Sequence, residues 1–143
     1  MDAERSAALL DRITKIPIVS TLDMRFDLFD EGYCKATVPY KRCYDGIFQS
    51  FHGGLLMTVA DSIACFAIMT QTGPDQFLTT TDMNIRFLGP CLTDVTAEAR
   101  VIKIGRSLCP VAVDLFDTQS KRVAVAQVTY MRLDKMPDRQ SLK

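Results

Sequence analysis

Asp61 is the residue of this chain best suited to chemistry, because it is the only charged residue within residues 53–70, GGLLMTVADSIACFAIMT. A carboxylate is costly to remove from water unless it is hydrogen-bonded or used, and an acid in a cleft often serves as a catalytic base. On a helix, one stripe would collect the polar residues Thr58, Asp61, Ser62 and Cys65. Asp61 is therefore a candidate catalytic group. The alternative is a structural acid that accepts a hydrogen bond from a loop amide or faces a gap in the sheet.

The sequence His52-Gly53-Gly54 opens this predicted helix and is suited to binding a negatively charged oxygen. Glycine lets a second group approach the backbone closely, and the free N–H groups of a helix N-terminus bind oxyanions and carbonyl oxygens. His52 is a candidate base. The simpler interpretations are that the two glycines only make the turn into the helix and that His52 caps the helix or packs against it.

The spacing between these two features predicts an oligomer. Gly53 and Asp61 are eight residues apart, so about 12 Å separates them along one helix axis. One small reacting group cannot easily touch both. Two antiparallel copies of the helix, related by a two-fold axis, would bring Gly53 of one subunit near Asp61 of the other. If both residues act on one substrate, the protein is at least a dimer.

Composition limits the classes of partner. The 143 residues suit a single domain, and 48% apolar with 24% charged residues are ordinary values for a globular chain. The formal net charge is zero and basic residues form no long run, so we expect no nucleic-acid partner. The N-terminus lacks the pattern of a signal peptide, and Asp61 makes residues 53–70 a poor membrane span. We therefore expect a cytoplasmic protein with no membrane partner.

The cysteines and the histidine make a metal site unexpected. Five cysteines form no CxxC pair, and an odd number favours reduced, buried thiols over disulfides. A single histidine leaves little for a Cys/His cluster. We expect no metal ligands in this chain.

The hydrophobic periodicity predicts the flanking elements. Residues 2–15 suit an amphipathic helix that buries Ala7, Leu10 and Ile13, and residues 134–143 suit a loose tail. Residues 39–52 have no steady period and are expected to form an ordered loop. Strand-like alternation covers residues 22–28, 34–38, 77–87, 95–101, 111–115 and 123–133. In the 77–87 strand, strict alternation places Thr79, Thr81 and Met83 on one face and Thr80 on the other.

This order of elements predicts an α+β fold in one domain over residues 1–143. Strands joined by short turns are antiparallel, and a helix that is apolar on most sides must be covered on most sides. We therefore expect a curved antiparallel sheet wrapped around one long central helix.

The HGG sequence, Asp61 and the following strand Thr79–Pro90, TTTDMNIRFLGP, together resemble the hotdog-fold acyl-CoA thioesterases, in particular the phenylacetate-pathway (PaaI-like) branch. Order and spacing match over roughly residues 20–133, and the combination is more specific than HGG alone. The resemblance implies hydrolysis of an acyl-CoA thioester to a carboxylic acid and free CoA. It implies no metal or redox cofactor, and a homo-oligomer in which a dimer of dimers is common.

The resemblance also implies residue roles. Gly53, with Gly54 beside it, would offer its N–H to the thioester carbonyl. Asp61 of the partner subunit would act as general base on water or as nucleophile, and Thr80 would help to position the water. His52 would support the loop that shapes the oxyanion site. The turn near the CoA nucleotide would contain Lys103, Gly105, Arg106 and Ser107.

One departure from the family pattern lies in the loop. Relatives often carry Asn or Gln six residues before the histidine, where this chain has Gly46. Gln49 is a candidate replacement, and Asn84 is the only asparagine in the chain. The missing amide keeps open a non-catalytic acyl-CoA binding module of the same fold.

Two other enzyme classes fit less well, and the acyl group stays open. A hotdog dehydratase would need His52 as its working base, and the turn that follows does not favour this. No GxSxG indicates a serine hydrolase. Phe48, Phe51, Met57 and Met69 are candidates to line an acyl pocket, and each is equally compatible with a place in the core.

Overall fold

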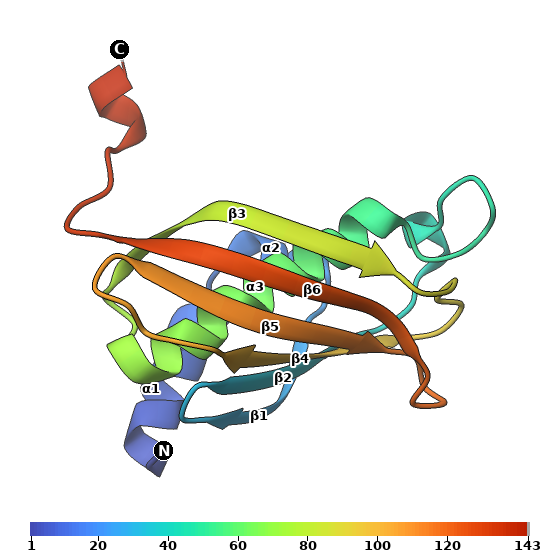
Figure 1. Ribbon diagram of the computed structural model, residues 1–143, viewed down its shortest axis with the longest axis horizontal. Coiled ribbons are helices and arrows are strands. Elements are labelled where there is room, and N and C mark those ends of the chain that lie inside the picture. The colour runs from blue at the N-terminus through green and yellow to red at the C-terminus, as the bar shows by residue number, and fades with distance from the viewer. Residues whose placement is uncertain (143) are drawn as a thin grey trace.

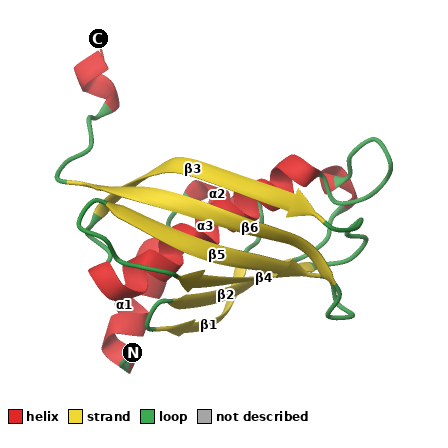
Figure 2. Cartoon of the chain, viewed as in Figure 1, coloured by secondary structure: helices red, strands yellow, loops and turns green. Residues whose placement is uncertain are grey.

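In the computed structural model, which describes residues 1–142, helix α3 lies against one face of a six-stranded antiparallel sheet (Figures 1 and 2). The strand order is β1-β2-β4-β5-β6-β3, so β1 and β3 form the two edges. The elements in chain order are α1 (Ala3–Thr14), α2 (Pro17–Thr21), β1 (Arg25–Asp30), β2 (Tyr33–Val38), the 3-10 helix η1 (Arg42–Tyr44), α3 (Gly53–Thr72), β3 (Phe77–Phe87), β4 (Val95–Val101), β5 (Leu108–Phe116), β6 (Arg122–Leu133) and the 3-10 helix η2 (Arg139–Leu142). The expected α+β layout, a sheet around one long helix, is confirmed.

Helix α3 forms the centre of the core. It packs against β2, β4 and β5, and burial of each of its large apolar side chains contributes about 1.5–3 kcal/mol to folding. By length and composition alone it is the one helix of residues 1–142 that could cross a membrane, but over half of its apolar window is buried inside the domain. Its fully or nearly buried residues are Leu56, Val59, Ala60, Ile63, Ala64, Phe66, Ala67, Ile68, Met69 and Thr70.

The first hairpin departs from strict alternation. Cys34, Ala36 and Val38 of β2 are buried as predicted. In β1 the pairing register shifts between Phe26 and Leu28, and this bulge reverses the side-chain alternation beyond it. Leu28, which strict alternation over residues 22–28 would place on the same face as Phe26, is 53% exposed, and Phe29 stacks on Phe26 in its place.

A second bulge lies in β3 and matters more for function. Thr80 pairs with Tyr130 of β6, but the next pair is Asp82 with Thr129, so Thr81 is the extra residue. Residues directly opposite each other in an antiparallel pair point to the same face. Thr80 therefore faces α3 together with Met83, and the prediction that these two residues lie on opposite faces is wrong.

The N-terminal helix α1 packs on α3 by a different stripe from the predicted one. Leu9 and Ile13 are buried, whereas Leu10 is exposed. Two overlapping apolar stripes existed in the sequence, and contact with α3 selects the one that contains Leu9. The expected helix over residues 2–15 spans Ala3–Thr14, with Asp2 accepting a hydrogen bond from the Arg5 N–H as its N-cap.

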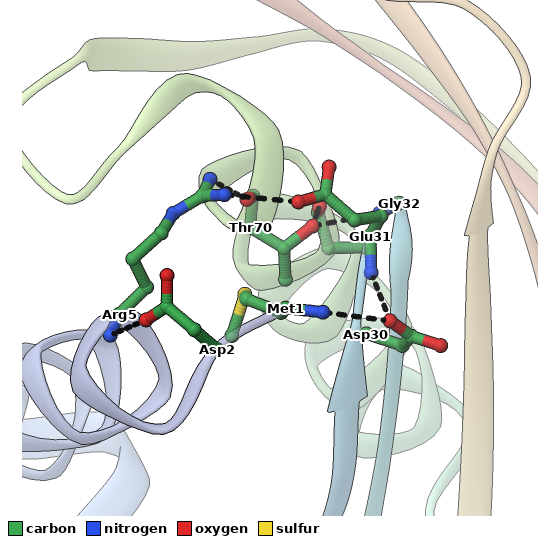
Figure 3. Close-up of polar contacts among 8 residues, drawn as sticks. Met1, Asp2, Arg5, Asp30, Glu31, Gly32 and Thr70 are labelled. Atoms are coloured by element: carbon green, nitrogen blue, oxygen red, sulfur yellow. Dashed lines mark hydrogen bonds and ion pairs between the residues drawn. The ribbon is translucent and has the colours of Figure 1, made fainter.

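Polar contacts join α1, the β1–β2 turn and the C-terminal end of α3 (Figure 3). The Arg5 guanidinium donates to the Glu31 carboxylate at 2.9 Å and to the Thr70 carbonyl oxygen at 2.8 Å. The Thr70 hydroxyl accepts from the Gly32 N–H at 2.8 Å. The Met1 amino group lies 3.3 Å from an Asp30 carboxylate oxygen. These contacts fix the end of α3 that lies farther from His52.

The C-terminal tail, expected to be loose over residues 134–143, contains the short helix η2 and stands away from the sheet in Figure 1. Lys143 lies outside the described residues.

The turn between β4 and β5 requires glycine at position 105. The Gly105 N–H donates to the Leu108 carbonyl oxygen at 3.0 Å, and a Cβ on Gly105 would collide with that same oxygen. We predict that Gly105→Ala lowers the free energy of unfolding by about 1–3 kcal/mol. Gly89→Ala is the control, because its Cβ would meet only the end of the flexible Lys121 side chain. Equal stabilities of the two variants in urea denaturation would contradict the prediction.

Candidate active site

Asp61 is half-buried on α3, and two hydroxyl groups hold one of its carboxylate oxygens. The Thr80 hydroxyl donates to Oδ1 at 2.7 Å, and the Tyr130 hydroxyl lies 2.9 Å from the same oxygen and 2.7 Å from the Asp61 carbonyl oxygen. Oδ2 accepts no hydrogen bond from the described part of the chain. The carboxylate is therefore fixed in direction while one oxygen stays available to a water molecule or a substrate.

Tyr130 is a site residue that sequence reasoning missed. It lies in β6, directly opposite Thr80, and its side chain is almost fully buried. Burial, and then the neighbouring Cys65 and Asp61, raise the pKa of the Tyr130 hydroxyl, so it stays protonated and donates. The sequence shows only a tyrosine in the predicted strand over residues 123–133. It does not show that this tyrosine reaches Asp61, because that depends on the register between β6 and β3.

The bulge at Thr81 explains why Thr80 reaches Asp61. Bulges redirect side chains and are common beside active sites. Without the extra residue, Thr80 and Met83 could not both face α3. The sequence therefore identified Thr80 through its resemblance to a family motif, and the pairing with β6 supplies the physical reason for its orientation.

The N-terminus of α3 carries a free donor. His52 is the N-cap, and its ring nitrogen Nδ1 accepts a hydrogen bond from the Gly54 N–H at 2.9 Å. A Cβ on Gly54 would lie 3.0 Å from His52 Cε1, so glycine lets the ring fold over the helix end. The Gly53 N–H has no hydrogen-bond partner within residues 1–142. His52 is thus placed to orient this end, and Gly53 to donate to a substrate oxygen.

The loop before α3 is anchored from both sides. The His52 N–H donates to the Tyr44 carbonyl oxygen and the Phe51 N–H to that of Cys91, each at 2.8 Å. Gln49 is exposed at the loop tip with a φ of 58° and does not reach Asp61 of its own chain. At Gly46 an added Cβ would meet His52 Cδ2 at an ordinary 3.6 Å. Packing therefore does not require glycine at position 46.

Gly53 and the two hydroxyl partners of Asp61 line separate hollows of the same chain. The hollow at Gly53 has a volume of about 350 Å³ and is lined by Phe51, Leu56 and Phe87 among others. The hollow beside Asp61 has about 340 Å³ and is lined by both of its hydroxyl partners and by Ser62. They share no lining residue. Within one subunit the oxyanion donor and the carboxylate are therefore apart, as the helix spacing predicted.

A larger hollow lies elsewhere. It has about 490 Å³ and lies on the outer face of the sheet, where Lys35 and Glu98 form an ion pair with N and O 3.9 Å apart. Its lining is polar and includes none of the site residues that the sequence proposed. Its carboxylates lie on the outer face of the sheet, away from both Asp61 and the N-terminus of α3.

The other proposed binding residues lie outside the Asp61 cluster. Asn84 is exposed on β3 and pairs with Gln127, so it faces away from α3. The β4–β5 turn exposes Lys103, Arg106 and Ser107. Its backbone is tied to β6, because the Arg132 N–H donates to the Ser107 carbonyl oxygen at 2.7 Å. This turn offers cations close to the strand ends that carry Thr80 and Tyr130.

Cys65 follows Asp61 by one helical turn but is unsuited to be a nucleophile. Burial, with the neighbouring Asp61, raises the pKa of the Cys65 thiol to about 12, so the thiolate is scarce at neutral pH. All five cysteines are free, and Cys43 is exposed, which corrects the expectation that all are buried. Within residues 1–142, no three His, Cys, Asp or Glu side chains gather as a metal would require.

Comparisons with known proteins give the site its context. The model of the thioesterase superfamily matches residues 48–124, which include His52, Asp61 and Thr80. A putative esterase of Haemophilus influenzae is 26% identical over 121 residues, 84% of this chain and 88% of the relative.

Solved structures share the fold. A thioesterase family protein from Silicibacter pomeroyi has a TM-score of 0.82 at 23% identity, covering 90% of this chain and 98% of that one. The PaaI protein of E. coli, from the phenylacetic acid degradation operon, has a TM-score of 0.83 at 22% identity, covering 92% and 95%. These likenesses show that the sheet around α3 is a hotdog fold.

The raised pKa of Cys65 predicts the order of thiol reactivity. At pH 8 the exposed Cys43 should react quickly with a disulfide reagent such as DTNB, whereas Cys65 should react slowly and speed up as the pH rises toward 12. Cys43→Ser should remove the fast phase, and Cys65→Ser should leave it unchanged. A fast phase at pH 8 that disappears in Cys65→Ser would refute the assignment.

Proposed function

Because the chain belongs to the thioesterase superfamily, we propose that it hydrolyses acyl-CoA thioesters to a carboxylic acid and free CoA. The observation that carries the proposal is the half-buried Asp61 carboxylate, oriented by two hydroxyl groups and open on its second oxygen. A fixed carboxylate beside a hollow can activate water or attack a carbonyl carbon directly.

The reaction needs a base and an oxyanion donor. With Asp61 as base, the carboxylate takes a proton from water while the water oxygen attacks the thioester carbonyl. The negative charge that develops on the carbonyl oxygen is stabilised by the Gly53 N–H at the positive end of the helix dipole. The intermediate collapses with release of the CoA thiolate, which takes the proton from Asp61. With Asp61 as nucleophile, a carboxylate oxygen attacks the carbonyl carbon, and the CoA thiolate leaves and takes a proton from water. Water then hydrolyses the acyl-aspartate to the carboxylic acid and restores the carboxylate.

A dimer completes this site in our proposal. The free Gly53 N–H and Asp61 lie about 12 Å apart along α3, too far for one thioester group within one subunit. The 11-residue strand β3 has an unpaired outer edge, and long open edges favour pairing with another chain. Ile47 and Phe48, 89% and 87% exposed at the loop tip, add apolar surface for a second copy to cover. Two copies related by a two-fold axis would then form two composite sites.

Coenzyme A is part of the proposed substrate. The exposed cations Lys103 and Arg106 on the β4–β5 turn, beside Gly105 and Ser107, suit the phosphates of CoA. The proposal includes no further cofactor. The free cysteines are compatible with action in the reducing cytoplasm.

A second function, acyl-CoA binding without turnover, is favoured by one observation. Gly46 stands where relatives often carry an amide, and Gln49 does not take its place at Asp61 within the subunit. Binding of an acyl-CoA with no release of free thiol would select this function.

The first prediction of the proposed function concerns Asp61. Asp61→Asn keeps the side-chain shape but removes the base, so kcat for release of free thiol should fall by about 10²–10⁴-fold. Asp82→Asn, on the exposed part of β3, is the matched control and should retain wild-type activity. Thr80→Val and Tyr130→Phe each remove one hydrogen bond to Oδ1, and each should lower kcat by about tenfold. Undiminished hydrolysis by Asp61→Asn would end the assignment.

The second prediction separates the backbone donor from the side chain. Gly53 is the first residue of α3 and follows His52 in extended backbone, with ψ 129°, a position that accepts proline. Gly53→Pro removes the N–H and should lower kcat by about 10²-fold or more. Gly53→Ala adds a Cβ but keeps the N–H, and should lose far less.

The same variant tests the composite site. Mixed and reassociated Gly53→Pro and Asp61→Asn subunits should regain about a quarter of wild-type activity, because half of the dimers are hybrids with one intact site. Neither variant should regain activity when its subunits are reassociated without the other variant. Failure of the mixture to regain activity, with hybrid dimers shown to be present by mass spectrometry, would place both residues of a site in one subunit.

A further inference from the structure

A second hollow continues from the one beside Asp61 along α3. The first hollow contains Ser62, Thr80 and Tyr130, and the second, of about 370 Å³, reaches Met69 and Pro74 at the far end of the helix. The two have four lining residues in common, so they adjoin: Ile16, Cys65, Phe66 and Leu78. We call these two hollows together the α3 groove.

The wall of the α3 groove is apolar along most of its length. Phe66 and Met69 come from α3 and Leu78 comes from β3, while Ile16, on the α1–α2 connection, and Ile18, in α2, line the opposite side. Cys65 contributes a neutral thiol, because burial raises its pKa. A charged or strongly hydrated group would lose its water in this stretch without gaining a partner.

The polar residues lie at the far end. Arg12, Asp75 and Gln76 line only the second hollow, at the point where the apolar wall stops. The distance along α3 from Asp61 to Met69 is about 12 Å, from eight residues at 1.5 Å each. An extended chain of methylene groups can follow this length, whereas a single ring would fill only part of it.

We propose that the α3 groove binds the acyl chain of the substrate, and that this chain is an unbranched aliphatic group of medium length. The inference rests on the proposed function, since it takes the thioester carbonyl to lie at Asp61, whose partners Thr80 and Tyr130 line the first hollow. The chain then passes Cys65 and Phe66, and its end meets Met69. The CoA phosphates remain outside, because no cation lines the first hollow.

Ile16 is the specificity-determining residue in this arrangement. It lies where the two hollows adjoin, on the connection between α1 and α2 and outside α3 and the sheet. A larger side chain there narrows the passage to the second hollow. A smaller one widens the passage. Either change should affect long acyl groups, which must pass this point, more than short ones.

The test is a chain-length series. We expect kcat/KM of the wild type to rise at least tenfold from butyryl-CoA to octanoyl-CoA, since each added methylene buries apolar surface. Ile16→Trp should abolish this rise, so that its kcat/KM falls at least tenfold more for octanoyl-CoA than for butyryl-CoA. Ile16→Ala should shift the preferred length upward, and it keeps the test decisive if the tryptophan variant does not fold. Ser20→Trp, exposed on α2 and outside the groove lining, is the matched control.

The outcomes separate this inference from the proposed function. Two results would refute acyl-chain binding in the α3 groove but keep the thioesterase activity. One is Asp61-dependent hydrolysis whose rate does not vary with chain length. The other is Asp61-dependent hydrolysis that is faster with phenylacetyl-CoA than with octanoyl-CoA. An Ile16→Trp defect equal at all lengths refutes this binding as well. If no acyl-CoA is hydrolysed, the affinities for octanoyl-CoA and for CoA are measured by calorimetry instead. Octanoyl-CoA binding that is tighter than CoA binding, and weakened by Ile16→Trp, supports the groove, and equal affinities overturn it.

Discussion

The need to bury α3 is the constraint on which the rest of the structure depends. The helix is apolar on most sides, and only a curved sheet can cover it over its length. Strands β2, β4 and β5 cover it closely. The side nearest to β3 is covered less completely, and the polar stripe of the helix is placed there. The same constraint that forms the core thus leaves one strip of α3 for chemistry.

Hydrogen bonds from the sheet turn that strip into a site. Thr80 and Tyr130 come from neighbouring strands and meet at one oxygen of Asp61. The bulge at Thr81 makes the meeting possible, because it changes which residues of β3 face the helix. An acid that would otherwise be a defect in an apolar helix is satisfied on one oxygen and free on the other. This is a preorganised arrangement for catalysis.

The parts of the proposed active site lie at different positions along α3. The free Gly53 N–H lies at one end, Asp61 near the middle, and the apolar groove continues toward Met69. In our proposal a second subunit supplies the missing half at the first end, and an acyl chain fills the groove toward the other. In this proposal α3 forms the core, supplies the oxyanion donor and lines the substrate site.

The sequence by itself determined α3, the layout around it and the candidates His52, Gly53, Asp61 and Thr80, because these depend on local periodicity and on motif spacing. Only the tertiary structure decided the orientation of Leu28 and Met83, since a bulge adds one residue that period-two alternation cannot reveal. The role of Tyr130 also required it, because the residue meets Asp61 across 69 positions of sequence. Contacts between distant segments depend on strand register, and register is set by the packing of the whole sheet against the helix.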